Sequence, residues 1–177
     1  MNDTVLTQLR SGIRDVADFP KPGIIFKDIT PLLADPHLLK LSIDALQETL
    51  GGQSIDKIVA IDARGFIFAG AIAERIGAGL VPVRKKGKLP FQTESIAYDL
   101  EYGSNTLEIH HDAIQPGERI WMIDDVLATG GTSAAAAALI ARLGGNLLGM
   151  SFLLELGFLE GRKFLPPGVP AHGVVVY

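Results

Sequence analysis

The sequence predicts an α/β fold, a doubly wound and mostly parallel sheet flanked by helices. Short apolar runs typical of buried strands alternate along the chain with helical patterns, which is the order that a parallel sheet requires. Three polar or charged segments follow such runs directly, at residues 62–65, 84–88 and 124–132. Because ligands of doubly wound sheets bind beyond the carboxyl ends of the strands, these segments also predict a binding site at one edge of the sheet.

The N-terminal part, about residues 1–34, is expected to contain one helix and an extended, turning stretch. Apolar residues at helical spacing predict a helix from Asp3 to Ala17, capped by Asp3 or Thr4. Three prolines and a glycine between residues 18 and 31 then exclude a long helix. Ile25 and Phe26 in this stretch could form an aromatic platform on a lid, or Phe26 could belong to the core. The local sequence leaves both open.

The remaining elements alternate in type. Helices are predicted over residues 35–50, 66–76 and 133–143, and buried strands over residues 55–61, 80–83, 119–124 and 146–154. Residues 91–110 predict a β-hairpin that turns around residues 102–105. A short helical or irregular piece at residues 157–165 and a last strand at residues 173–177 complete the chain. One domain is therefore expected over residues 1–177.

Composition limits the classes of function. The 177 residues, 47% of them hydrophobic and 20% charged, fit one compact globular domain. No apolar run reaches the roughly 20 residues of a membrane span, and the N-terminus lacks a signal pattern, so a cytoplasmic protein without membrane contact is expected. With no cysteine, disulfides and thiolate metal sites are excluded. The net charge of −4 argues against nucleic acid as a partner.

Residues 120–133 (IWMIDDVLATGGTS) have the pattern of a phosphate site. A buried strand leads to Asp124 and Asp125, and a turn of small residues precedes an Ala-rich helix. Glycines let backbone amides approach an anion, and the helix N-terminus adds positive potential. Since the loop has no lysine, we interpret it as a site for one phosphate, with the aspartates accepting hydrogen bonds from ribose hydroxyls. The alternative is an ordinary strand–turn–helix in which an aspartate caps the helix.

Two further strand ends carry cations. The arginine in residues 62–65 (DARG) could bind pyrophosphate, although such a turn taken alone favours a solvated arginine. Residues 84–88 (RKKGK) place four cations within five positions. Such a run is usually a solvated loop, and a nuclear-localisation or RNA patch is an alternative. Beside a phosphate loop in an acidic chain, it favours a polyanionic substrate.

The long polar segment within about residues 84–110 is interpreted as a flap. Flaps exclude water, which matters where a reactive sugar centre could be hydrolysed. Glu101 and Tyr102 lie in this segment and are candidates for contacting the reacting groups. They could equally be ordinary hairpin residues.

Five motifs together resemble the adenine phosphoribosyltransferases, a family of type I phosphoribosyltransferases. They are residues 19–31 (FPKPGIIFKDITP), 62–66 (DARGF), 83–90 (VRKKGKLP), 100–103 (LEYG) and 123–132 (IDDVLATGGT). The resemblance implies a homodimeric purine-salvage enzyme with a base-binding hood at residues 1–34 and a catalytic flap at residues 84–110. It would transfer a phosphoribosyl group from phosphoribosyl pyrophosphate (PRPP) to N9 of adenine, giving AMP and pyrophosphate. Mg²⁺ is implied as the cofactor, held mainly by PRPP and water.

The resemblance also implies a role for each motif. The 5′-phosphate and ribose are expected at Asp124, Asp125, Ala128, Thr129, Gly130, Gly131 and Thr132. Pyrophosphate is expected at Asp62, Ala63, Arg64, Arg84, Lys85 and Lys88, in a family whose first loop often contains a non-proline cis peptide. Adenine is expected at Ile25, Phe26, Lys27 and Arg64. Catalysis is assigned to Glu101, Tyr102 and Asp125.

Lys27 departs from the family, which usually has arginine at this position. Lysine lacks the planar fork of arginine, so contacts to the edge of the base are expected to be looser. Two rival functions remain. A phosphoribosyltransferase for another base is disfavoured by the sequence of residues 23–27 (GIIFK), and a non-catalytic regulator that binds nucleotides or RNA is disfavoured by the intact residues 84–88 and 101–102.

Overall fold

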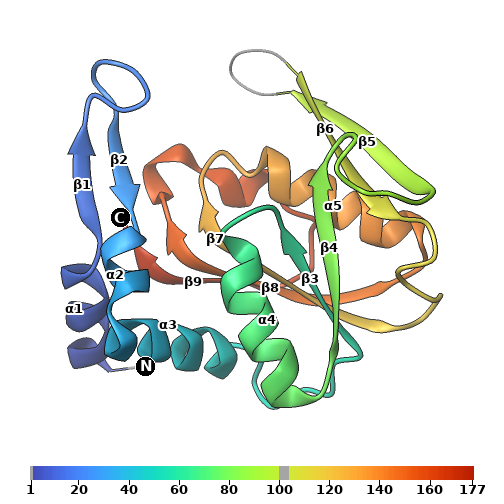
Figure 1. Cartoon of the computed structure of the whole chain (residues 1–177), viewed down its shortest axis with the longest axis horizontal. Helices are drawn as coiled ribbons and strands as arrows, with labels where there is room; N and C mark the ends of the chain where they lie inside the picture. The colour runs from blue at the N-terminus through green and yellow to red at the C-terminus, as the bar shows by residue number, and fades with distance from the viewer. Residues whose placement is uncertain (1, 100–103) are drawn as a thin grey trace. The chain divides into compact units, whose positions relative to one another are not determined.

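The computed structural model describes residues 2–99 and 104–177 of the chain, which divides into two compact units, Met1–Ala45 and Leu46–Tyr177. Figure 1 shows the order of the helices and strands. None of the helices in the described part of the chain is long and apolar enough to cross a membrane.

The first unit consists of short helices and a two-stranded sheet. Its elements are α1 (Asp3–Ser11), β1 (Arg14–Ala17), β2 (Ile25–Asp28), α2 (Thr30–Ala34) and most of α3 (Pro36–Glu48). Strands β1 and β2 pair antiparallel. The helix predicted for residues 35–50 corresponds to α3, and the shorter helix α2 before it was not predicted. The stretch predicted to be extended and turning contains strand β2.

The predicted helix from Asp3 to Ala17 is wrong beyond Ser11. The amide of Gly12 bonds to carbonyls of the last turn, and the residues after it form β1 instead. Helical spacing could not reveal this, because the partner strand lies on the other side of the proline-rich stretch. The predicted cap is also wrong, since Asn2 caps the helix by accepting from the Val5 amide at 2.9 Å.

Asp28 joins β2 to the start of α2. Its carboxylate accepts hydrogen bonds from the Thr30 amide at 2.9 Å and the Thr30 hydroxyl at 2.8 Å, and forms an ion pair with Arg14 at 2.5 Å. The Thr30 amide, followed by the Arg14 guanidinium, lowers the pKa of Asp28 to about 2.

This lowered pKa predicts an acid-dependent loss of stability. An unfolded aspartate has a pKa of about 3.9, so the contribution of Asp28 is fully present above that pH and is lost as the pH falls toward 2. We expect the melting temperature of Asp28→Asn to fall less steeply than that of the wild type below pH 4. Asp112→Asn, a change at an exposed aspartate, is the control. Parallel curves for Asp28→Asn and wild type would show that the Asp28 contacts do not stabilise the fold.

The second unit is built on a seven-stranded sheet with the strand order β5-β6-β4-β3-β7-β8-β9. Its elements in chain order are β3 (Lys57–Ile61), α4 (Gly65–Ile76), β4 (Gly79–Lys85), β5 (Thr93–Asp99), β6 (Ser104–His110), β7 (Arg119–Leu127), α5 (Gly131–Arg142), β8 (Asn146–Glu155), the 3₁₀ helices η1 (Gly157–Leu159) and η2 (Gly161–Phe164), and β9 (Ala171–Val176). Strands β4, β3, β7, β8 and β9 are parallel, whereas β5 and β6 form an antiparallel hairpin at one edge. The predicted doubly wound, mostly parallel sheet is confirmed.

Helices α4 and α5 cover opposite faces of this sheet. Helix α4 connects β3 to β4 in one direction along the sheet, and α5 connects β7 to β8 in the other. Because such crossovers are right-handed, reversing the direction changes the face. The strand order thus reverses between β3 and β7, which are hydrogen-bonded neighbours, and ligands of this fold class bind at such a point.

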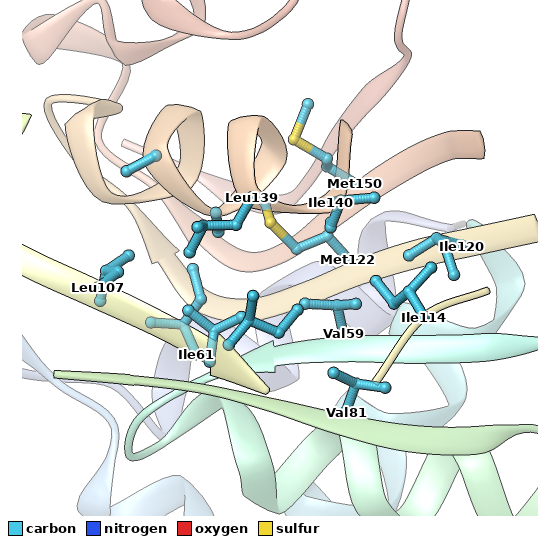
Figure 2. Packing of buried hydrophobic residues seen from close by; sticks show 14 of the residues in the cluster. Val59, Ile61, Val81, Leu107, Ile114, Ile120, Met122, Leu139, Ile140 and Met150 are labelled. Carbon is cyan, nitrogen blue, oxygen red and sulfur yellow. The ribbon is translucent and has the colours of Figure 1, made fainter. Parts of the chain in front are cut away.

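A layer of aliphatic side chains joins α5 to the sheet. Figure 2 shows Leu139 and Ile140 of α5 packed over Met122 of β7 and over Val59 and Ile61 of β3. All five are almost fully buried. Burial on this scale fixes α5, and with it the loop at its N-terminus, against the central strands.

The central strand is longer than predicted. Strand β7 was expected to end at Asp124 but runs to Leu127, so Asp124 and Asp125 lie inside it. Its pairing with β3 stops at Ile123, whereas its pairing with β8 continues to Leu127 opposite Glu155. The two aspartates therefore lie in the part of β7 that extends beyond the end of its pairing with β3 and is paired with β8 alone.

Candidate active site

The two aspartates of β7 are held almost without exposure to solvent. Asp124 is 7% exposed and Asp125 is 6% exposed. The Asp125 amide donates to Asp124 Oδ1 at 2.9 Å, and Asp125 Oδ2 forms an ion pair with Arg64 Nε at 2.5 Å. Gly65 allows this arrangement, because a Cβ there would lie 2.7 Å from Asp124 Oδ1. The N-terminus of α4 thus packs directly on the carboxylate pair.

Burial raises the pKa of Asp124 well above its ordinary value, and the neighbouring charge of Asp125 raises it further. Burial and the neighbouring charge make the ionised form of Asp124 unfavourable. A hydrogen-bond donor that reaches its carboxylate stabilises that ionised form. Ligand hydroxyl groups are donors of this kind.

The ends of β3 and β4 are linked through Asp62 and Arg84. Arg84 Nε donates to Asp62 Oδ2 at 3.0 Å, and Arg84 Nη1 donates to the Lys88 carbonyl at 3.1 Å. The Asp62–Ala63 peptide bond is cis. The two cationic segments therefore lie side by side at the carboxyl ends of adjacent parallel strands.

The glycine-rich loop between β7 and α5 presents its backbone to the same region. Gly130 has a φ of +85°, which only glycine adopts readily, and α5 begins at the next residue. The helix-capping alternative for Asp124 and Asp125 is wrong, because the N-cap position is Gly130. The helix N-terminus and the loop amides form an environment that favours an anion.

A cavity of about 270 Å³ joins these three segments. The predicted residues that line it are Asp62, Ala63, Arg64, Lys85, Asp124, Asp125, Ala128, Thr129, Gly130 and Thr132. Gly131 lines a neighbouring, more apolar cavity of about 620 Å³ instead. Arg84 and Lys88 line neither, and they meet through the hydrogen bond to the Lys88 carbonyl.

Comparison with known proteins identifies the family. Residues 29–155 match the phosphoribosyl transferase domain. The chain is 55% identical over 165 residues to the adenine phosphoribosyltransferase of Thermobifida fusca, covering 93% of this chain and 94% of that protein. The corresponding enzyme of a Synechococcus species is 53% identical over 169 residues, with 95% and 97% covered. This chain belongs to the adenine phosphoribosyltransferase family.

Solved structures of the family have the same fold. The adenine phosphoribosyltransferase of Rhodothermus marinus superposes with a TM-score of 0.94 at 54% identity, covering 99% of this chain and all of the other. The Saccharomyces cerevisiae enzyme, crystallised with an imino-altritol bisphosphate and adenine, gives a TM-score of 0.92 at 38% identity, covering 98% and 100%. This chain therefore has the fold of the solved adenine phosphoribosyltransferases, as the motifs predicted.

The residues expected to bind adenine in an adenine phosphoribosyltransferase lie on strand β2 of the first unit. Ile25 is 57% exposed, and Phe26 is half-buried with its ring edge-on to Phe19 at a centroid distance of 5.2 Å. Lys27 Nζ forms an ion pair with Asp15 at 2.6 Å. Phe26 is thus only partly buried, which disfavours the core interpretation, and its service as a platform for the base stays a prediction.

Motif reasoning missed Tyr98 and Asn105, which also line the 270 Å³ cavity. They face each other across the β5–β6 hairpin. Only the register of the hairpin could have pointed to them, because neither lies in a family motif that was used. Glu101 and Tyr102, the predicted catalytic residues of the flap, lie outside the described residues.

Proposed function

We propose that this protein transfers the 5-phosphoribosyl group from PRPP to N9 of adenine, forming AMP and pyrophosphate for purine salvage. The observation that carries the proposal is the cavity at the strand-order reversal, where paired aspartates, a glycine-rich loop and a cationic loop meet. The identity to relatives named adenine phosphoribosyltransferase supports adenine as the acceptor.

The second unit is assigned to PRPP. A 5′-phosphate would accept hydrogen bonds from the amides and hydroxyls of residues 128–132, and the ribose hydroxyls would donate to Asp124 and Asp125. Arg64 lies at the junction of these groups through its ion pair with Asp125. Pyrophosphate would then lie on residues 62–64 and Lys85, with Arg84 and Lys88 adding positive charge.

Little covalent chemistry is required of the protein in such a transfer. Neutralising the leaving pyrophosphate and holding C1′ against N9 lower the barrier, because the charge that develops on the leaving oxygens is met by groups already in place. We infer that Mg²⁺, when bound together with PRPP, would supply further positive charge against the pyrophosphate. The family resemblance implies that its ligands would come mainly from PRPP and water.

Adenine is assigned to Ile25, Phe26 and Lys27, together with Arg64. The family resemblance also assigns Glu101 and Tyr102 to catalysis, and it implies a cytoplasmic homodimer. The catalytic roles, the cytoplasmic location and the homodimer remain predictions. Sedimentation of the purified protein would test the homodimer.

The Phe26→Ala variant tests the adenine assignment. If the ring stacks on the base, adenine affinity should fall by about 1–3 kcal/mol, the range for aromatic–base stacking, with the melting temperature little changed. Kinetics at saturating PRPP would measure the change in adenine affinity, and thermal unfolding would measure the change in melting temperature. Phe158→Ala, which removes an exposed phenylalanine of the second unit that lies outside the proposed flap and lines neither cavity, is the matched control. A large drop in melting temperature with adenine affinity intact would mean that Phe26 serves stability alone.

The reaction itself is tested by pyrophosphate release from PRPP and Mg²⁺ in the presence of adenine, hypoxanthine, guanine, xanthine, orotate or uracil. Release with adenine alone is expected. Release with another base would keep the reaction class and overturn the assignment of residues 25–27. Binding of PRPP without release for any base would favour a non-catalytic regulator.

A further inference from the structure

Tyr98 connects the edge hairpin to the first turn of α5, directly after the glycine-rich loop. Thr132 Oγ1 donates a hydrogen bond to the Tyr98 hydroxyl at 3.2 Å. The Tyr98 side chain lines both the polar cavity of about 270 Å³ and the apolar cavity of about 620 Å³ beside it. Its ring also packs against the aliphatic core that Figure 2 shows. The phenol thus has an apolar body held by packing and a hydroxyl at the site.

The position of Tyr98 is fixed by regular structure. Strand β5 runs alongside α5, with Tyr98 at the first turn of the helix and Ser95 near its last turn, where Arg142 Nη1 donates to the Ser95 carbonyl at 2.8 Å. Ile96 packs on the core between these two contacts. The same strand is therefore attached to both ends of the helix that carries Thr132.

The hydrogen-bond capacity of the two hydroxyls determines what happens when an anion binds. Each hydroxyl has one proton to donate and two lone pairs to accept with. An ionised phosphate only accepts, so Thr132 must turn its proton from Tyr98 toward the phosphate oxygen. The Tyr98 hydroxyl is then free to donate to Thr132 Oγ1, and a chain of two bonds in one direction polarises the Thr132 donor.

We propose that Tyr98 is a phosphate-recognition residue, which orients and polarises the Thr132 hydroxyl toward the 5′-phosphate of the phosphoribosyl substrate. This inference rests on the proposed function, because it takes residues 128–132 as the phosphate site. The ligand class is a sugar phosphomonoester, and Tyr98 acts on it through Thr132 as a positioning residue.

The Tyr98→Phe variant removes the hydroxyl and keeps the ring. We expect the dissociation constant of ribose 5-phosphate, measured by calorimetry, and the KM for PRPP to rise by about 5- to 30-fold, the range for one hydrogen bond strengthened by an ionised acceptor. The KM for adenine and the melting temperature should stay near wild-type values. Tyr177→Phe, the same change outside the lining of either cavity, is the matched control.

A double-mutant cycle with Thr132→Val separates this role from general packing. If Tyr98 acts through Thr132, Tyr98→Phe should add little to the loss of ribose 5-phosphate affinity in the Thr132→Val background. Unchanged ribose 5-phosphate affinity in Tyr98→Phe, or full additivity in the cycle, would overturn the proposal. Wild-type protein that binds ribose 5-phosphate but releases no pyrophosphate would contradict the proposed reaction while leaving the cycle interpretable.

Discussion

Replacing Asp125 by asparagine is expected to lower kcat/KM by about 10- to 100-fold while leaving the fold intact. Asp125 is 6% exposed and forms an ion pair with Arg64 at 2.5 Å. The amide keeps the shape but loses the charge, so the bond to Arg64 and the proposed bond to a ribose hydroxyl both weaken. Hydrogen bonds to charged groups contribute about 1.5–3 kcal/mol, and each 1.4 kcal/mol is about tenfold in rate.

The same variant should change the pH dependence. The charge of Asp125 contributes to the raised pKa of Asp124, second to burial. Removing that charge allows Asp124 to ionise at a lower pH, so any acid limb of the kcat/KM profile that reflects Asp124 should move to lower pH.

The control for this experiment is Asp44→Asn, which makes the same change in a surface ion pair with Lys40. Such pairs contribute little, so its kinetics should match those of the wild type. An unchanged kcat/KM in Asp125→Asn would remove Asp125 from the active site, whatever the melting temperature.

Much of the sheet could be predicted because its strands are buried on both faces. Residues 57–61 and 119–123 are nearly continuous apolar runs, a pattern that identifies a central parallel strand without further information. The glycine-rich loop was predictable for a different reason. Its proposed anion binding depends on backbone amides that consecutive small residues leave accessible, and this is a local feature of the sequence.

The errors occurred where a distant partner decides the structure. Strand β1 is a strand because β2 pairs with it, and β7 continues past Ile123 because β8 pairs with it there. Tyr98 and Asn105 were missed for the same reason, because they reach the cavity from a hairpin that is distant in sequence from the glycine-rich loop. A local sequence pattern cannot predict contacts between segments that are far apart in the chain.

Gly161→Ala is expected to weaken binding of PRPP and ribose 5-phosphate by about tenfold or more. A Cβ at Gly161 would lie 2.1 Å from the carbonyl oxygen of Ala128 and 3.0 Å from the amide nitrogen of Gly130. The start of η2 therefore packs, backbone to backbone, against the loop proposed to bind the phosphate. Overpacking of this kind costs about 1–3 kcal/mol, and each 1.4 kcal/mol is about tenfold in affinity.

The segment around Gly161 cannot easily retreat to make room for the extra methyl group. Arg162 binds Glu155 through two hydrogen bonds of 2.5 and 2.6 Å and donates to the Ala171 carbonyl at 2.7 Å. Glu155 is itself buried at the end of β8. The strain must therefore fall largely on residues 128–130, which is the part of the site that a phosphate would contact.

Gly70→Ala is the matched control, because a Cβ there would meet its nearest neighbour at 4.0 Å and α4 accepts alanine readily. Arg162→Lys gives the complementary test. It removes the bidentate clamp on Glu155 and lets the segment move, so combining it with Gly161→Ala should restore part of the lost affinity for ribose 5-phosphate at a further cost in melting temperature. If Gly161→Ala lowers the melting temperature but binds ribose 5-phosphate like the wild type, the strain is absorbed in η2. The backbone contact would then support the fold without setting the geometry of the loop.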